Sequence, residues 1–353
     1  MPPRKRNSEN TGLPKRWRHM HNAYYYRVPS GLEHLWDGKR QFRLGRTLTE
    51  AYRAWAERLE TPDEIRTIGE LLDRYALQVL PGKAPKSRRE QIPIVNRLKK
   101  VFGTMPLNAI EPQHVYQYVD KRTAKTAAIR EIEVLRHALT KAAEWGLTKS
   151  NPLLGQLQLR GRKPQPRVRY IEDWELQEAL SLPSRQKRGS VGMIQAYIRV
   201  KLLTGLRRTD LLCLQVDDLL DSGIYVKPRK TEHTTGKELI ITWSDELRTA
   251  VQAALEMRPV TTSSWVFCTR KGESYFSEVE GTANGFDSIW QRFMRRLLSE
   301  TRLEHRFAER DLRAKCASDA TSLEHAQQLL AHADQKTTLR WYRRKPEKVK
   351  PLR

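Results

Sequence analysis

Three short stretches in the second half of the sequence contain side chains that could break and remake a phosphodiester bond. They are Leu203-Thr-Gly-Leu-Arg-Arg-Thr-Asp210, Arg310-Asp-Leu-Arg313 and Leu329-Leu-Ala-His332, and a tyrosine, Tyr342, follows the last of them. A tyrosine phenolate can attack phosphorus and keep the bond energy in a covalent intermediate. A free tyrosine has a pKa of about 10 and is a weak nucleophile, so it needs a base or a positive field. Guanidinium groups that hold the phosphate oxygens supply such a field.

In order and spacing, these stretches resemble the motifs of the tyrosine recombinases, specifically the lambda-type phage integrases. That family has a Thr-Gly-Leu-Arg helix junction, a His-x-Leu-Arg box, a Leu-Gly-His segment and a tyrosine shortly after a Thr-Thr pair. The resemblance covers about residues 170–344 and includes four motifs in the family's order. The upstream sequence is similar in architecture and in the pattern of residues 24–45.

The resemblance implies catalytic roles for specific residues. Arg207 and Arg313 would be the two arginines that hold the scissile phosphate. His332 would hydrogen-bond the phosphate or carry a proton. Tyr342 would be the nucleophile and form a 3′-phosphotyrosyl link to DNA. No metal or ATP is implied, because the arginines supply the positive charge and the covalent link keeps the bond energy.

Three more residues complete the implied site. Lys230 would protonate the leaving 5′-oxygen, and Lys237, across the same expected turn, is its alternative. Asp210, three residues after Arg207, would orient that arginine. Arg310 occupies the place of the family's histidine in the second motif and can still donate to phosphate.

Two departures from the family pattern keep an alternative function open. Arg310 cannot act as a base, and Tyr342 follows His332 by ten residues where nine is usual, with Trp341 in the ninth place. We expect an irregular turn to absorb the extra residue. The alternative is a non-catalytic DNA-binding or architectural protein that retains the recombinase fold.

The composition favours a polyanionic partner. The 353 residues include 65 Lys+Arg and 41 Asp+Glu, a formal net charge of +24. Residues 1–60, 61–160 and 161–353 carry +7, +7 and +10, so the excess is spread over the whole chain. Double-stranded DNA is the expected partner, because each neutralised phosphate releases counterions. No apolar run approaches the roughly 18–20 residues of a membrane span, and three distant cysteines favour a reducing compartment, the bacterial cytoplasm.

The expected fold class is a multidomain α+β protein with the tyrosine recombinase fold. We predict an arm-site DNA-binding domain with a small β-sheet over residues 1–60 and an all-α core-binding domain over residues 61–158. A basic linker would cover residues 159–169. A mainly α catalytic domain with a β-hairpin and a C-terminal tail would cover residues 170–353.

Local signals predict the elements. Strands are expected near residues 21–29 and 39–45, and the capping box Thr47/Glu50 would open a helix. Helices are expected to start at Thr61 and to cover 92–102, 112–122 and 124–145, with a basic loop at 83–89. Further on, a helix should break at Thr204-Gly205 and resume near Asp210. A hairpin would pair residues 224–228 with 238–243.

Recombination between two duplexes implies a homotetramer on core and arm attachment sites, with a host DNA-bending protein and an excisionase as further partners and no membrane. The candidate DNA-binding residues are Arg16, Arg18, Arg27, Arg43, Lys83, Lys86, Arg88, Arg89, Arg162 and Lys163.

Overall fold

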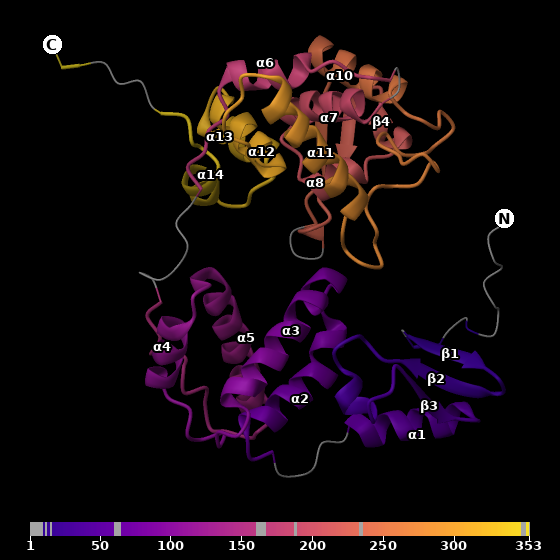
Figure 1. The fold of residues 1–353 in the computed structure, drawn as a ribbon, viewed down its shortest axis with the longest axis vertical. Helices are drawn as coiled ribbons and strands as arrows, with labels where there is room; N and C mark the ends of the chain where they lie inside the picture. Colours follow the sequence, from indigo (N-terminus) through magenta and orange to yellow (C-terminus); the bar gives the residue numbers. More distant parts are fainter. Residues whose placement is uncertain are drawn as a thin grey trace. The chain divides into compact units, whose positions relative to one another are not determined.

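The computed structural model describes residues 10, 13–14, 16–59, 65–159, 167–186, 189–232, 236–346 and 351–352, with the backbone alone at residues 56 and 59. The chain forms two compact units, Met1–Pro164 and Gln165–Arg353 (Figure 1). The division falls within the predicted linker. The separate arm-site and core-binding domains stay a prediction, because the first unit has one continuous hydrophobic core that extends from Trp17 to Leu159.

The first unit begins with a three-stranded antiparallel sheet in the order β1-β2-β3 (Figure 1). Its strands are β1 Trp17–Met20, β2 Ala23–Arg27 and β3 Gln41–Gly45, and helix α1 Leu48–Leu59 follows. His21 and Asn22 both have positive φ, 48° and 57°, as a two-residue hairpin turn requires. Strand β1 was not predicted from the sequence. The predicted Thr47/Glu50 capping box forms, with hydrogen bonds of 3.2 and 3.3 Å.

The rest of the first unit is helical, and two of its helices start at other residues than the sequence predicts. Its helices are α2 Ile68–Gln78, α3 Pro85–Phe102, α4 Pro112–Lys121 and α5 Lys125–Glu144. Helix α2 begins after a capping box of Thr67 and Glu70 rather than at Thr61, which lies outside the described residues. The predicted basic loop 83–89 was wrong beyond residue 84. Pro85 is pre-organised for the first helical turn and Lys and Arg are good helix formers, so α3 starts there.

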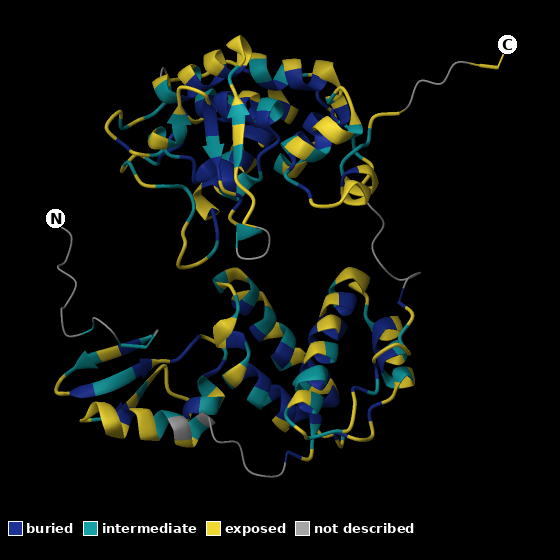
Figure 2. Ribbon diagram, turned by 180° about the vertical axis from the view of Figure 1, so that it is seen from behind, coloured by how far each residue is buried: buried dark blue, intermediate teal, exposed yellow. Residues whose placement is uncertain are grey.

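The second unit is built around helix α7 Ser190–Thr204, whose Ile194, Tyr197 and Ile198 are completely buried. In each unit, buried residues gather inside and exposed residues lie on the outer sides of the helices (Figure 2). The predicted break at Gly205 and the predicted hairpin are present, and strand β4 is an addition to them. The other elements are α6 Asp173–Ser181, α8 Arg208–Leu212, β4 Leu219–Leu220, β5 Gly223–Val226, β6 Leu239–Thr242, α10 Asp245–Glu256, α11 Asn284–Glu300, α12 Glu309–Asp319, α13 Leu323–Leu329 and α14 Gln335–Trp341.

The state of the cysteines and the character of the helices bear on two further predictions. The three cysteines are buried and unpaired with one another. In the described parts of the chain, no helix has the length and apolar character needed to cross a membrane.

Candidate active site

The junction between α7 and α8 places Arg207. Gly205 ends α7 in the left-handed conformation, with φ 62°. A Cβ at this position would lie 3.1 Å from the Cys316 sulfur and 3.1 Å from a Leu330 methyl carbon. Glycine is therefore favoured by its left-handed backbone, and any larger residue would force these neighbours to shift. Arg207 follows as the extended N-cap residue of α8, with its side chain about one-fifth exposed.

Arg313, on α12, connects three of the sequence motifs. Its guanidinium donates hydrogen bonds to the backbone oxygen of Gly205 and, at 2.6 Å, to that of Leu330. It also lies 3.3 Å from His332 Nε2. The residue is buried, and its Nε–H has no partner in the described structure. Burial, and then the charge of Arg207, lower the pKa of Arg313 to about 10.

Asp210 connects Arg207 with the hairpin turn. One carboxylate oxygen lies 3.9 Å from Arg207 Nη1, and the other accepts the backbone N–H of Arg229 at 3.1 Å. Burial raises the pKa of Asp210, and that hydrogen bond and the charge of Arg207 oppose the rise. The structure thus places Asp210 between Arg207 and the hairpin turn, and its orienting role stays a prediction.

His332 is buried and neutral near pH 7. Because the Arg313 guanidinium can only donate, His332 Nε2 must accept, and Nδ1–H must then donate to Thr338 Oγ1 at 2.9 Å. Burial, followed by the charges of Arg313, Arg207 and Lys230, lowers the pKa of His332 to about 4. The histidine can therefore orient and hydrogen-bond, but it is a weak base.

Tyr342 lies against these groups, one residue beyond α14. Its ring centre is 4.8 Å from that of His332 and 5.5 Å from the Arg313 guanidinium carbon. The backbone N–H groups of Tyr342 and Arg343 both donate to Thr338 O, at 3.0 and 3.1 Å. The bond from Tyr342 is the ordinary helical one, and the wide turn comes at Arg343, after the tyrosine; Trp341, in the family's ninth place, is exposed.

Lys230 and Arg310 are less closely tied to this group. Lys230 is exposed in the turn after β5, beside Arg229, and its charge contributes to the lowered pKa of His332. Arg310 is exposed in the first turn of α12, three residues before Arg313 and so on the same helix side. Lys237 is also exposed. Within the described residues, the structure thus brings Arg207, Asp210, Arg313, His332 and Tyr342 together.

Sequence reasoning missed a buried ionic network that fixes α12 to α7. Lys201 is completely buried and forms an ion pair with Glu309, and Tyr197 Oη donates to Glu309 Oε1 at 2.5 Å. Glu309 immediately precedes Arg310. The only signal in the sequence is a lysine in an apolar helix, four residues after a tyrosine, and nothing local identifies its partner 108 residues away.

Comparison with known proteins identifies the family. Residues 175–348 match the model of the phage integrase family. The second unit is a tyrosine recombinase domain of the phage integrase family. Its reaction class is therefore site-specific DNA recombination. Among curated proteins, no sequence matches this chain.

Solved structures have the same fold. A lambda integrase tetramer bound to a Holliday junction is 19% identical, with 96% of this chain and 98% of that chain covered and a TM-score of 0.57. A lambda integrase fragment, a dimer bound to a core site, is 18% identical, with 80% of this chain and 99% of that chain covered and a TM-score of 0.62. The Tn1549 transposon integrase with circular intermediate DNA is 15% identical, with 79% of this chain and 95% of that chain covered and a TM-score of 0.60. The predicted recombinase fold is confirmed.

In this recombinase, three of the candidate DNA-binding residues share the sheet with a tyrosine run. Arg18 on β1 and Arg43 on β3 are both register partners of Tyr25 on β2. The two arginines are exposed and Tyr25 is half-buried, whereas Tyr26 is buried in the core. Arg18, Tyr25 and Arg43 form a basic row across the sheet, and Arg27 is exposed at the end of β2.

The other candidate residues are in different environments. Lys83 donates to Tyr75 Oη at 2.8 Å and to Gln91 Oε1 at 3.0 Å. Arg88 is buried. The pKa of Arg16 is lowered, first by the burial of Arg16 and then by the charge of Arg88. The remaining candidates are Lys86, 4.0 Å from Glu90; Arg89, which is exposed; and Arg162 and Lys163, which lie outside the described residues.

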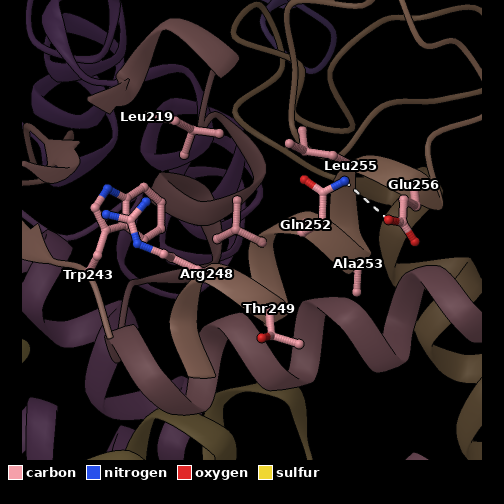
Figure 3. A pocket seen from close by; sticks show the side chains of 9 residues that line it. Leu219, Trp243, Arg248, Thr249, Gln252, Ala253, Leu255 and Glu256 are labelled. Carbon is pink, nitrogen blue, oxygen red and sulfur yellow. Dashed lines mark hydrogen bonds between the residues drawn. The ribbon is translucent and has the colours of Figure 1, made fainter. Parts of the chain in front are cut away.

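A shallow hollow of about 560 Å³ lies on the recombinase domain. Figure 3 shows the side chains that line it. Trp243, with the Arg248 guanidinium 4.9 Å from its ring centre, closes one side. Gln252 and Glu256 hydrogen-bond on α10 at 3.1 Å. None of the candidate catalytic side chains lines this hollow. The parts of the chain that are described also contain no group of three His, Cys, Asp or Glu residues able to hold a metal.

Proposed function

We propose that the protein is a phage or prophage integrase that joins and separates DNA at attachment sites, with Tyr342 as nucleophile. The observation that carries this proposal is the position of Tyr342, whose ring contacts His332 and the guanidinium of Arg313. Arg313 itself is bonded to the backbones of the two other motifs. A tyrosine used only for packing would not need a buried arginine beside it.

In the proposed cleavage step, one bond to phosphorus forms and one breaks. Tyr342 Oη attacks the scissile phosphorus and loses its proton to solvent, and the bond from phosphorus to the 5′-oxygen breaks. Arg207 and Arg313 hold the non-bridging oxygens, where preorganised donors are each worth about 3–4 kcal/mol. The buried, unpartnered Nε–H of Arg313 is a donor that a phosphate oxygen would satisfy.

Lys230 would give a proton to the leaving 5′-oxygen, since an exposed ammonium can be recharged from water. His332 is too weak a base to take the tyrosine proton at neutral pH and would instead orient Arg313 through Nε2. Religation reverses the step when the 5′-hydroxyl of the partner strand attacks the phosphotyrosine. The covalent link keeps the bond energy, so we propose that neither metal nor ATP takes part.

We further propose that four copies act on two duplexes in a bacterial cell. The similar lambda integrase forms a tetramer on a Holliday junction. The basic row of Arg18, Tyr25 and Arg43 suits an arm site, because arginines neutralise phosphates and release counterions. A host DNA-bending protein and an excisionase are proposed as accessory partners, in keeping with the resemblance to lambda-type integrases.

A nicked attachment-site substrate, from which the short cut strand diffuses away, tests the proposal. Wild type should accumulate a covalent protein–DNA adduct that resists detergent, and Tyr342→Phe should not. Tyr225→Phe, on β5 of the same unit, is the matched control and should form the adduct. Excess chelator should leave the adduct yield unchanged; a metal-dependent transposase would lose activity.

The second candidate function is a non-catalytic DNA-binding protein with the recombinase fold. Arg310, which stands where the family has histidine, favours it. Site-specific binding by wild type with no adduct would support this alternative and contradict the integrase.

A further inference from the structure

Two segments far apart in sequence bind the same buried carboxylate on α12. The side chain of Asp311 is completely buried and lies 2.9 Å from Arg167 Nη2 and 2.7 Å from Arg344 Nη1. Arg167 is at the end of the predicted linker, and Arg344 is two residues after Tyr342. Asp311 also accepts the backbone N–H of Ala308 at 2.8 Å, which caps α12.

Asp319, near the other end of α12, repeats this arrangement. It accepts from Tyr170 Oη at 2.6 Å and lies 2.8 Å from Lys315 Nζ and 3.5 Å from Lys345 Nζ. Tyr170 belongs to the segment that enters the second unit, and Lys345 to the segment that follows Tyr342. Both segments therefore lie against α12 and share its two aspartates.

Arg344 fixes the chain immediately after Tyr342. Its side chain is one-tenth exposed, and Nη1 also donates to Arg169 O at 3.0 Å. Its backbone N–H donates to Ser318 Oγ at 2.8 Å, and that hydroxyl donates to Tyr342 O at 3.0 Å. Polar contacts to α12 thus hold the backbone on both sides of Arg343.

Apolar contacts contribute little to holding this segment. Helix α14 has seven residues and buries only Thr338 among them. The adjoining apolar cluster consists of Ala317, Ala326 and Leu330, with Tyr342 itself packed at its edge. Because a helix this short is marginal without tertiary contacts, the polar contacts to α12 decide where Tyr342 lies.

We propose that Asp311, Arg344 and Ser318 form a latch that positions Tyr342 beside Arg313, and that Arg167 couples the latch to the linker. Arg167 covers Asp311, so a linker that withdraws Arg167 admits water to the carboxylate and weakens its pair with Arg344. The same movement carries away Arg169 O, a second acceptor of Arg344. These are positioning residues; their effect on cleavage rests on the proposed function.

Amide hydrogen exchange on the full chain without DNA tests the latch independently of catalysis. Arg344→Ala should speed exchange at residues 342–344 by roughly 10- to 100-fold, as expected for a lost charged hydrogen bond, and leave α7 unchanged. Arg344→Lys should restore part of the protection. Arg343→Ala is the matched control, because this neighbouring arginine has no side-chain partner in the described structure. Equal exchange in Arg344→Ala and Arg343→Ala would overturn the latch.

Arg167→Ala tests the coupling. In the described residues Arg167 forms no hydrogen bond with Tyr342 or Arg344, yet its removal should speed exchange at residues 342–344 by several-fold, on the order of a weakened charged pair. Unchanged or slower exchange would overturn the role of the linker while leaving the latch itself intact.

Single-turnover cleavage of the nicked substrate at saturating DNA tests the consequence for Tyr342. Arg344→Ala should cleave roughly 10- to 100-fold more slowly than Arg343→Ala, and Arg344→Lys should recover part of the rate. If exchange rises but the two alanine variants cleave equally fast, the positioning role is wrong. If wild type forms no adduct, the proposed function fails, and the exchange result still decides the latch.

Discussion

The backbone oxygen of Gly205 accepts a hydrogen bond from the guanidinium of Arg313, which lies 108 residues later in the chain. The glycine that ends α7 therefore does two things: it turns the chain so that Arg207 follows, and it supplies an acceptor for the other arginine. The relative position of the two arginines is set by one backbone group.

Gly205→Ala should damage this arrangement more than its backbone strain alone explains. A left-handed alanine costs about 1–2 kcal/mol, and here the new Cβ also meets Cys316 and Leu330 at 3.1 Å. Gly146→Ala is the matched control, because Gly146 has a φ of 74° and an added methyl group there would meet no heavy atom within 4 Å. Denaturant unfolding should show a larger loss of stability for Gly205→Ala, together with slower cleavage; equal losses would contradict the close contact.

The stability of the second unit should fall as the pH drops from about 6.5 to 4. His332 has a pKa of about 4 in the folded protein, against about 6.5 in an unfolded chain. Between these values the unfolded chain binds a proton that the folded chain does not, so stability is lost as the pH decreases. The expected loss is about 2 kcal/mol after allowance for solvent screening.

Denaturant titrations of wild type and His332→Gln at several pH values between roughly 7.5 and 4.5, which span most of this window, measure this loss. Glutamine can still hydrogen-bond but does not titrate, so its stability should depend less on pH. Parallel pH profiles for the two proteins would show that His332 is not the responsible group.

Lys201→Met should be strongly destabilising because it leaves the buried carboxylate of Glu309 without its cation. Breaking one side of a buried ion pair costs about 3–5 kcal/mol. The double variant Lys201→Met/Glu309→Gln removes both charges and should be more stable than the single variant. A double-mutant cycle with no coupling free energy would show that the network does not hold α12 on α7.

A change of the leaving group distinguishes the roles of Lys230 and Lys237. Lys230→Ala should cleave about 10²- to 10⁴-fold more slowly, and Lys237→Ala should remain close to wild type. A substrate with sulfur in place of the 5′-oxygen needs no proton on departure, so it should restore most of the Lys230→Ala rate. Rescue of Lys237→Ala instead would assign the proton to that residue.

Much of the fold was predictable because its signals are local. The Thr47/Glu50 capping box and the break at Gly205 each depend on a few adjacent residues, and both are present. The basic stretch before residue 90 forms a helix where a loop was expected, because the proline that begins α3 outweighs the high local charge.

The candidate site likewise has residues that local motifs could predict and contacts between distant residues that they could not. Ordered motifs were enough to select Arg207, Arg313, His332 and Tyr342, which the fold brings together. Local pattern could not show that Asp311 binds both Arg167 and Arg344, because these residues are 144 and 33 positions from it and each resembles an ordinary surface charge.

The shared acceptor at the end of α14 bears on how such sequences are recognised. Thr338 O accepts both the ordinary helical bond from Tyr342 and the additional bond from Arg343. A tyrosine ten residues after His332 thus ends the helix with its ring against that histidine. A search pattern that insists on nine residues would discard this chain, whereas one that allows a single-residue slip, and asks for a buried threonine between the two, would keep it.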